Sequence, residues 1–80
     1  PPDSAVIVDP PRAGLSPRVV ERLITLAPRN MLYVSCNPSV LARELPAFLE
    51  SYHLVSLEAV DLFPHTPHVE TIATLERRET

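Results

Sequence analysis

Tyr33-Val34-Ser35-Cys36-Asn37-Pro38 lies where a short apolar run gives way to a helical pattern, and it holds the only cysteine of the chain. This change of pattern predicts that Cys36 sits between the end of a strand and the start of a helix. The carboxyl ends of strands are usual places for chemistry in an α/β sheet, and a helix N-terminus favours negative charge such as a thiolate. Taken alone, however, a single cysteine is more often a small buried apolar residue than a nucleophile.

Length and composition bound the possible functions. Eighty residues allow one domain with a small core, and a hydrophobic content of 45% argues against disorder. A lone cysteine cannot form an internal disulfide, so we expect a reducing cytoplasm. No apolar run approaches the roughly 20 residues that span a bilayer, so no membrane partner is expected. The net charge of −3 is not that of a free-standing nucleic-acid binder.

The segment before the hexapeptide predicts a strand, a loop and a helix. The apolar run Ala5–Val8 is typical of a strand buried on both faces of a parallel sheet. Asp9-Pro-Pro-Arg12 follows, where the prolines end strand pairing, and Gly14 is expected to loosen the loop. Ser16-Pro17 predicts the N-cap and first turn of an amphipathic helix, which Pro28 ends.

The second strand is predicted at Met31–Ser35, immediately before Cys36. A helical crossover of this length joins parallel strands and is right-handed. The carboxyl ends of parallel strands meet at one edge of a sheet. Asp9 and Cys36 should therefore emerge there on neighbouring strands.

The remainder of the chain predicts one more helix and two strands. Asn37-Pro38 offers an N-cap, and apolar residues then recur at helical spacing from Val40 to Tyr52. Pro46 inside this stripe predicts two short helical pieces or a bent helix. His53–Val60 predicts a third strand and Val69–Leu75 a strongly β-branched fourth. The eight residues between them suit an antiparallel return through a long loop, and the fold class is α/β.

Three polar clusters lie at strand ends or in loops, namely Asp9–Arg12, Ser35–Pro38 and His65–Glu70. Each has an ordinary explanation, because aspartate is common in turns, histidine in surface loops and glutamate on solvated strands. No metal site is expected, because one cysteine without a second ligand pair does not match zinc spacing.

Taken together and in this order, the clusters resemble a known family. Asp-Pro-Pro-Arg-x-Gly-Leu from Asp9, Val-Ser-Cys-Asn-Pro from Val34 and Leu-Phe-Pro-His-Thr-x-His-Val-Glu-Thr from Leu62 are similar to the C-terminal part of the S-adenosylmethionine-dependent RNA 5-methyluridine methyltransferases. These enzymes modify uridine in tRNA or ribosomal RNA. The resemblance runs from Val6 to Leu75. It implies the C-terminal portion of a Rossmann-like methyltransferase sheet, with two parallel strands and crossover helices, then a strand pair ending in an antiparallel strand.

The resemblance also implies roles for single residues. Cys36 corresponds to the family's nucleophile and Glu70 to its general base. Asp9 corresponds to an aspartate between cofactor and target base, which makes it a candidate for binding both. Further candidates for contact with the substrate are Pro10, Arg12, Asn37 and His65. Arg12 suits a phosphate or carboxylate, whereas the histidines more readily shape the loop that carries Glu70.

The implied reaction explains why these residue types are needed. C5 of uracil is too weak a nucleophile to attack a methyl sulfonium. Addition of a thiolate at C6 converts the ring to an enolate, whose C5 can attack. A base must then remove the C5 proton so that the thiol can leave. Such enzymes act on a nucleotide turned out of its stack.

The chain lacks two features of the complete family pattern. With a single glycine it has no glycine-rich cofactor loop, and the acidic residue that would hold a ribose is also missing. We therefore expect residues 1–80 to be a fragment, the C-terminal segment of a catalytic domain that is inactive alone. Tight binding of S-adenosylmethionine by the eighty-residue chain in titration calorimetry would overturn this expectation.

Two other functions stay open. An RNA cytosine-C5 methyltransferase also uses a cysteine, but it is expected to carry a second one in an Asp-x-Pro-Cys setting, where this chain has Arg12. A non-catalytic α/β module for binding or assembly would use the exposed edge of Ala5–Val8, because unpaired edges invite self-association. Within the methyltransferases, the form of the third motif leans slightly towards the ribosomal branch.

Overall fold

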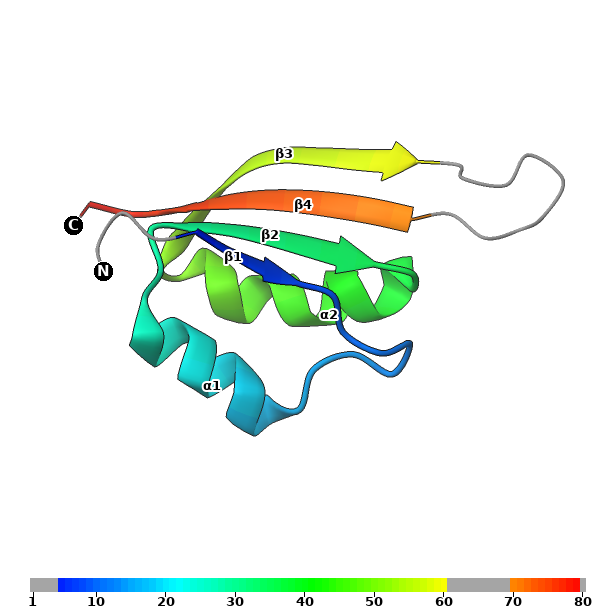
Figure 1. Cartoon of the computed structure of the whole chain (residues 1–80), viewed down its shortest axis with the longest axis horizontal. Helices are drawn as coiled ribbons and strands as arrows, with labels where there is room; N and C mark the ends of the chain where they lie inside the picture. The colour runs from blue at the N-terminus through cyan, green and yellow to red at the C-terminus, as the bar shows by residue number, and fades with distance from the viewer. Residues whose placement is uncertain (1–4, 61–69, 80) are drawn as a thin grey trace, which may run out of the picture.

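The computed structural model describes residues 5–60 and 70–79, which form one four-stranded sheet and two helices. In chain order the elements are β1 (Ala5–Val8), α1 (Pro17–Leu26), β2 (Asn30–Ser35), α2 (Pro38–Leu49), β3 (Tyr52–Val60) and β4 (Glu70–Arg77). The strand order across the sheet is β1-β2-β4-β3 (Figure 1). β1 and β2 are parallel, and β4 is antiparallel to both β2 and β3.

The predicted β-α-β unit with parallel strands and the antiparallel return are both confirmed. The sequence did not reveal that the last strand enters the interior of the sheet, between β2 and β3. Burial explains this position. Alternate residues of β4 are buried, namely Thr71, Ala73 and Leu75, whereas most of β3 is exposed and lies at the edge.

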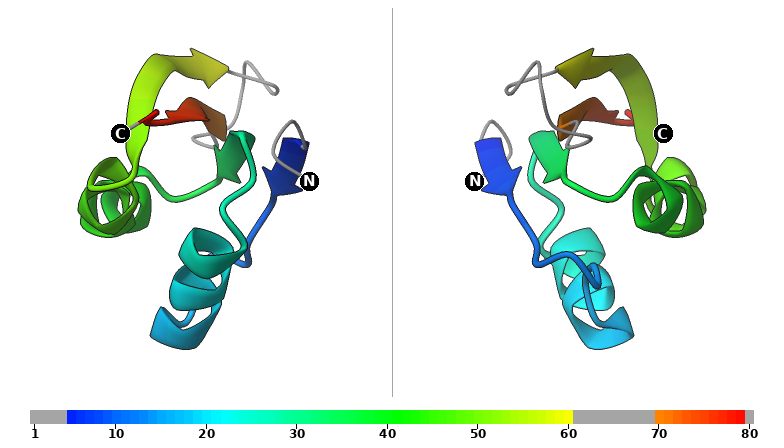
Figure 2. Two further views of the ribbon diagram at one scale, coloured as in Figure 1. Left: turned by 90° about the vertical axis from the view of Figure 1, so that its left-hand side faces the viewer. Right: turned by 90° about the vertical axis from the view of Figure 1, so that its right-hand side faces the viewer.

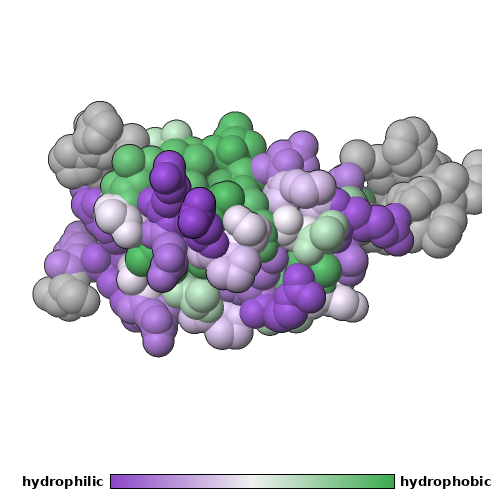
Figure 3. All heavy atoms as spheres, turned by 90° about the horizontal axis from the view of Figure 1, so that it is seen from below, coloured by the Kyte–Doolittle hydropathy of each residue, from purple (hydrophilic) through white to green (hydrophobic). Residues whose placement is uncertain are grey.

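Both helices cover the same face of the sheet (Figure 2). The β2 residues that point towards them are almost fully buried, with Met31 1% and Tyr33 0% exposed. On β1, Ile7 is 72% exposed, so the expectation that Ala5–Val8 is buried on both faces is wrong for the described residues. From the helix side, hydrophobic residues gather along one edge and mixed residues cover the rest (Figure 3).

The core lies between the two helices and the middle of the sheet. Its largest fully buried side chains are those of Tyr33, Tyr52, Phe48, Met31, Leu75 and Pro28. The rings of Tyr33 and Phe48 meet edge to face, with centroids 6.4 Å apart and planes at 78°. The Tyr52 hydroxyl donates a hydrogen bond to the Pro28 carbonyl. The polar end of this buried ring is therefore satisfied.

Helix α1 begins and ends as the sequence predicts. The Ser16 hydroxyl accepts a hydrogen bond from the Val19 N–H at 3.3 Å, which confirms the N-cap. Ala27 closes the helix in the left-handed region at φ 52°, and its N–H donates to the Leu23 carbonyl. Pro28 follows and prevents continuation of the helix.

Helix α2 is one continuous helix across Pro46. The predicted interruption into two pieces is therefore wrong, whereas the predicted bend at Pro46 stays a prediction. Pro46 and Ala42, whose carbonyl loses its usual partner four residues on, are both exposed, so water can satisfy that carbonyl. The helix also ends at Leu49, and Tyr52 belongs to β3 instead of the helical stripe.

Candidate active site

Cys36 and Glu70 lie at the same end of two adjacent strands. Ser35, the last residue of β2, pairs with Thr71 of β4. Cys36 follows Ser35 and Glu70 precedes Thr71, so these two residues continue the register by one step. Both side chains are half-buried. The structure thus places the predicted nucleophile and the predicted base at the same end of two neighbouring strands in the middle of the sheet.

Asp9 lies at the same end of the sheet, after strand β1. Val8, the last residue of β1, pairs with Tyr33 of β2, and Asp9 follows it. The prediction that Asp9 and Cys36 follow parallel neighbouring strands at the same end of the sheet is confirmed by the β1–β2 register. Figure 1 shows the two strands running side by side in the same direction. Asp9 is exposed, so its carboxylate is accessible to a ligand.

A tight turn fixes the backbone on either side of Cys36. The Ser35 hydroxyl accepts a hydrogen bond from the Asn37 N–H at 3.0 Å and donates one to the Asn37 carbonyl at 2.9 Å. Asn37 is the extended N-cap residue of α2, but its side chain makes no capping bond. Its Nδ2 instead donates to the Arg12 carbonyl at 3.3 Å. This contact ties the cysteine turn to the Asp9–Arg12 segment.

The other predicted substrate residues have different surroundings. Pro10 is half-buried, whereas Arg12 is exposed, and its backbone carbonyl accepts the hydrogen bond from Asn37. The guanidinium of Arg12 therefore has access to solvent at the site edge. His65 lies outside the described residues.

Glu44 also lies in this region, although no motif of the sequence pointed to it. It lies in α2 and is 8% exposed. Its Oε1 accepts a hydrogen bond from the Tyr33 hydroxyl, and its Oε2 accepts one from the Leu15 N–H at 2.9 Å. The sequence held a signal, because Glu44 stands three residues after Leu41 and four before Phe48, on the helix face that is buried.

Tyr33 is held in its neutral form by this environment. Burial raises the pKa of its hydroxyl far above the ordinary value of 10.0, and the hydrogen bond to Glu44 and the charge of that carboxylate raise it further. Tyr33 therefore acts as a hydrogen-bond donor to Glu44 throughout the neutral pH range.

Gly14 is fixed by its surroundings and does not loosen the loop. Its φ is +91°, and its N–H donates to the Pro11 carbonyl at 2.8 Å. A Cβ at this position would collide with the Glu44 carboxylate and with Val40 of the same helix. Glycine is needed here both for the backbone conformation and for the close approach to α2.

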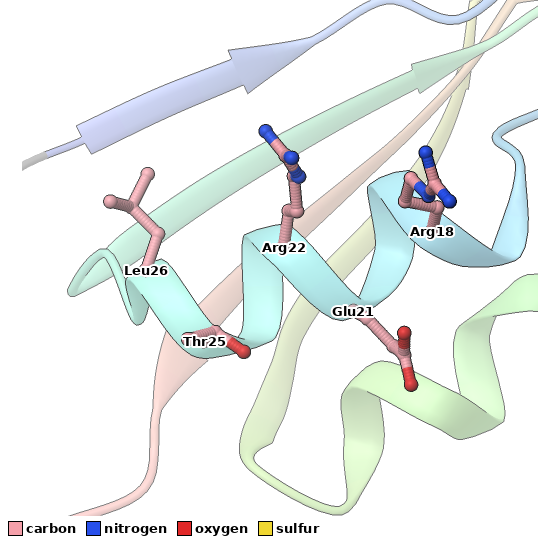
Figure 4. Close-up of a pocket in the computed structure, with 5 residues that line it drawn as sticks. All are labelled: Arg18, Glu21, Arg22, Thr25 and Leu26. Carbon is pink, nitrogen blue, oxygen red and sulfur yellow. The ribbon is translucent and has the colours of Figure 1, made fainter.

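A cavity on the outer side of α1 contains none of the predicted site residues. Its lining consists of Arg18, Glu21, Arg22, Thr25 and Leu26. Arg18, Arg22 and Leu26 project to one side of the helix and Glu21 to the other (Figure 4). Within residues 5–60 and 70–79, no three His, Cys, Asp or Glu side chains are grouped as a metal site would need. Neither described helix has the length and apolar character to cross a membrane.

Comparison with known proteins covers nearly the whole chain. The model of the family described as tRNA (Uracil-5-)-methyltransferase matches residues 3–78. An uncharacterized RNA methyltransferase of Nitratidesulfovibrio vulgaris is 47% identical over 74 residues, which are 92% of this chain and 16% of the relative. One from Bacillus cereus is 44% identical over 73 residues, 91% of this chain and 16% of the relative. The chain thus spans about a sixth of the length of these relatives.

A solved structure shares the fold. It is the Pyrococcus abyssi tRNA (uracil-54, C5)-methyltransferase in complex with S-adenosyl-L-homocysteine. The TM-score is 0.80 at 51% sequence identity, covering 90% of this chain and 18% of that one. This likeness confirms the predicted fold class, a part of a Rossmann-like sheet.

Proposed function

Because the chain belongs to the tRNA (uracil-5-)-methyltransferase family, we propose that it forms part of the catalytic domain of an enzyme that methylates C5 of uridine in tRNA. The family resemblance drawn from the three motifs is confirmed by this match. The chain spans about a sixth of its relatives. On the resemblance of its three motifs, we assign residues 1–80 to the C-terminal segment of that domain.

The observation that carries the proposal is that a thiol and a carboxylate lie at the same end of adjacent strands. Cys36 and Glu70 are the next residues beyond the Ser35–Thr71 pair of adjacent antiparallel strands. A thiol that adds to one ring carbon and a base that takes a proton from the next must approach the same base from nearby positions. The register supplies that proximity through the backbone.

In the proposed reaction the Cys36 thiolate adds to C6 of the uracil ring. A bond forms between Sγ and C6, and the electron pair of the 5,6 double bond moves onto C5 and its carbonyl. Bound S-adenosylmethionine supplies an electrophilic methyl group for C5. Glu70 then accepts the C5 proton, the electron pair of that C–H bond restores the double bond, and the Sγ–C6 bond breaks to return the thiolate.

Among the described residues, Asp9 is the candidate for contact with the cofactor. Asp9 offers an exposed carboxylate at the carboxyl end of β1, a usual position for ligand contacts in α/β sheets. Gly14 does not provide a cofactor loop, because its close approach is to Glu44 of α2. The S-adenosyl-L-homocysteine bound to the Pyrococcus abyssi enzyme supports S-adenosylmethionine as the methyl donor.

The comparisons favour transfer RNA as the substrate over ribosomal RNA, towards which the third motif leaned. Both the family description and the Pyrococcus abyssi structure name a tRNA enzyme. Arg12, Pro10, Asn37 and His65 stay proposals for contacts to that RNA. We place the protein in the cytoplasm, where a lone thiol stays reduced.

Methyl transfer by variants of the full-length protein that carries this chain tests the proposal. We expect Cys36→Ala to abolish transfer to uridine and Glu70→Gln to lower kcat by about 10²- to 10⁴-fold. Glu58→Gln is the matched control, because Glu58 is an exposed carboxylate on neighbouring β3. Methylation by Cys36→Ala at the wild-type rate would refute the assigned nucleophile.

A further inference from the structure

Residues 12–15 lie in the loop between strand β1 with its following Asp9 and helix α1. Side chains of the turn after Cys36 and of helix α2 hold this loop. Asn37 Nδ2 donates to the Arg12 carbonyl and an Arg43 guanidinium N–H donates to the Ala13 carbonyl, both at 3.3 Å. Glu44 Oε2 accepts the Leu15 N–H at 2.9 Å. The contacts therefore run from the turn and helix that follow Cys36 to the loop that follows Asp9.

Glu44 is the buried member of this set. A carboxylate that is 8% exposed is costly to bury unless its oxygens are hydrogen-bonded. Tyr33 and Leu15 supply donors to the two oxygens. The Arg43 guanidinium lies 3.8 Å from Oε2, but it is largely exposed and contributes little. The carboxylate is thus bound on one side by β2 and on the other by segment 12–15.

Gly14 shows independently that the loop is fitted to this carboxylate. Any side chain at Gly14 would collide with Glu44 and Val40, and its φ of +91° disfavours other residues. Loop and helix therefore approach more closely than a Cβ permits, at the residue next to the Leu15 N–H that Glu44 binds.

We propose that Glu44 is a positioning residue, whose carboxylate fixes segment 12–15 against α2 and thereby sets Asp9 relative to Cys36. This inference rests on the proposed function for its catalytic consequence, but not for the loop position itself. A misplacement of about 1 Å at a reacting centre costs about 100-fold in rate. Loss of the Glu44 carboxylate therefore lowers kcat because Asp9 is misplaced, although Glu44 itself does not contact the substrate.

The alternative is that Glu44 serves only the stability of the core, and a double variant separates the two roles. Tyr33→Phe with Glu44→Leu replaces both buried partners by apolar groups, which can leave stability nearly unchanged. The double variant keeps the core but cannot bind the Leu15 N–H. Glu44→Gln is the conservative variant, because its amide can still accept that N–H and donate to the Tyr33 oxygen.

Hydrogen exchange of the eighty-residue chain tests the loop position. We expect the protection of the Leu15 amide from exchange to fall at least tenfold in the double variant and to be kept in Glu44→Gln. The protection of the amides of strand β2 should stay unchanged in both variants. Equal Leu15 protection in the wild type and the double variant would overturn the proposal. This measurement involves no methyl transfer, so it stands or fails separately from the proposed function.

Kinetics of the full-length protein test the consequence for the site. The double variant should show a kcat about 10- to 100-fold lower, with KM for RNA changed less than about threefold. Glu44→Gln, by contrast, should retain most of the wild-type kcat. Glu50→Leu, the same substitution at the exposed end of α2, should leave both constants unchanged. A wild-type kcat in the double variant would show that Glu44 is structural only and would contradict the proposal.

Discussion

Tyr33 joins the core to the candidate site through a single side chain. Its ring packs edge to face on Phe48, and its hydroxyl donates to the buried carboxylate of Glu44. Tyr52 provides a natural comparison, because it is equally buried but donates to a neutral backbone carbonyl. Hydrogen bonds to charged partners contribute more to stability than bonds between neutral groups.

Removal of the Tyr33 hydroxyl should therefore destabilise the chain more than removal of the Tyr52 hydroxyl. We expect Tyr33→Phe to lower the free energy of unfolding by about 1.5–3 kcal/mol and Tyr52→Phe by about 0.5–1.5 kcal/mol. Urea denaturation followed by circular dichroism measures both values. Equal losses in the two variants would show that the Glu44 carboxylate gives Tyr33 no special importance.

Helix α2 stays continuous across an exposed proline because its amphipathic face is buried. Leu41, Glu44 and Phe48 are buried on one side, while Pro46 lies on the exposed side. Burial of that face keeps the helix continuous despite one missing backbone hydrogen bond. Pro46 therefore lowers the stability of the helix, and replacing it should restore that stability.

Pro46→Ala should stabilise the chain. A proline in a regular helix interior costs about 3 kcal/mol relative to alanine, and the greater freedom of the unfolded alanine chain offsets about 1 kcal/mol of that gain. We expect the free energy of unfolding to rise by about 1–2 kcal/mol in urea denaturation. Pro38→Ala is the control with little change, because Pro38 occupies the first helical turn. A loss of stability in Pro46→Ala would contradict this account.

The order and type of the elements could be predicted from local patterns, but their lateral arrangement could not. Apolar runs and N-cap residues such as Ser16 identify strands and helix starts within a few residues. The insertion of β4 between β2 and β3 depends on which faces are buried after all elements meet. Sequence spacing alone does not contain that information.

The same division holds for the candidate site. The convergence of Asp9 and Cys36 follows from the parallel β-α-β unit, and it could be predicted. The position of Glu70 directly beside Cys36 needed the β2–β4 register. The contacts of Glu44 with Tyr33 and Leu15 join segments 11 and 29 residues apart, which no local pattern reveals.

The whole molecule presents a sheet with helices on one face and β1 at one edge. β1 contains no charged residue, and Ile7 is 72% exposed. Charged residues are a common means of blocking association at such edges. Within residues 5–60 and 70–79, β1 pairs with β2 alone, and its free edge favours assembly with a second copy.

We predict that the eighty-residue chain self-associates through β1. Sedimentation velocity should show a larger species that grows with concentration, and Ile7→Lys should shift the chain to monomer by placing a charge at the edge. Val55→Lys is a matched control on exposed β3. A monomer at every concentration of the wild-type chain would contradict the prediction.

The folded chain should lose stability in alkali because of its two tyrosines. Burial raises the pKa of both hydroxyls above 10.0, so the folded state keeps protons that the unfolded state loses. Stability is therefore fully present below pH 10 and falls as pH rises above it. Absorbance at a tyrosinate wavelength should increase only together with unfolding. An increase that precedes loss of the circular dichroism signal would contradict the burial of these hydroxyls.

In the proposed reaction, Cys36 attacks C6 of uracil and a base then removes the C5 proton. Fluorine in place of that hydrogen cannot be taken as a proton, so elimination is blocked and the thiol adduct should persist. The most direct measurement is peptide mass spectrometry of the full-length protein after reaction with S-adenosylmethionine and tRNA containing 5-fluorouridine. We expect a methylated fluorouridine adduct on the peptide that contains Cys36 and no such adduct in Cys36→Ala. An adduct on any other residue, with Cys36 unmodified, would contradict it.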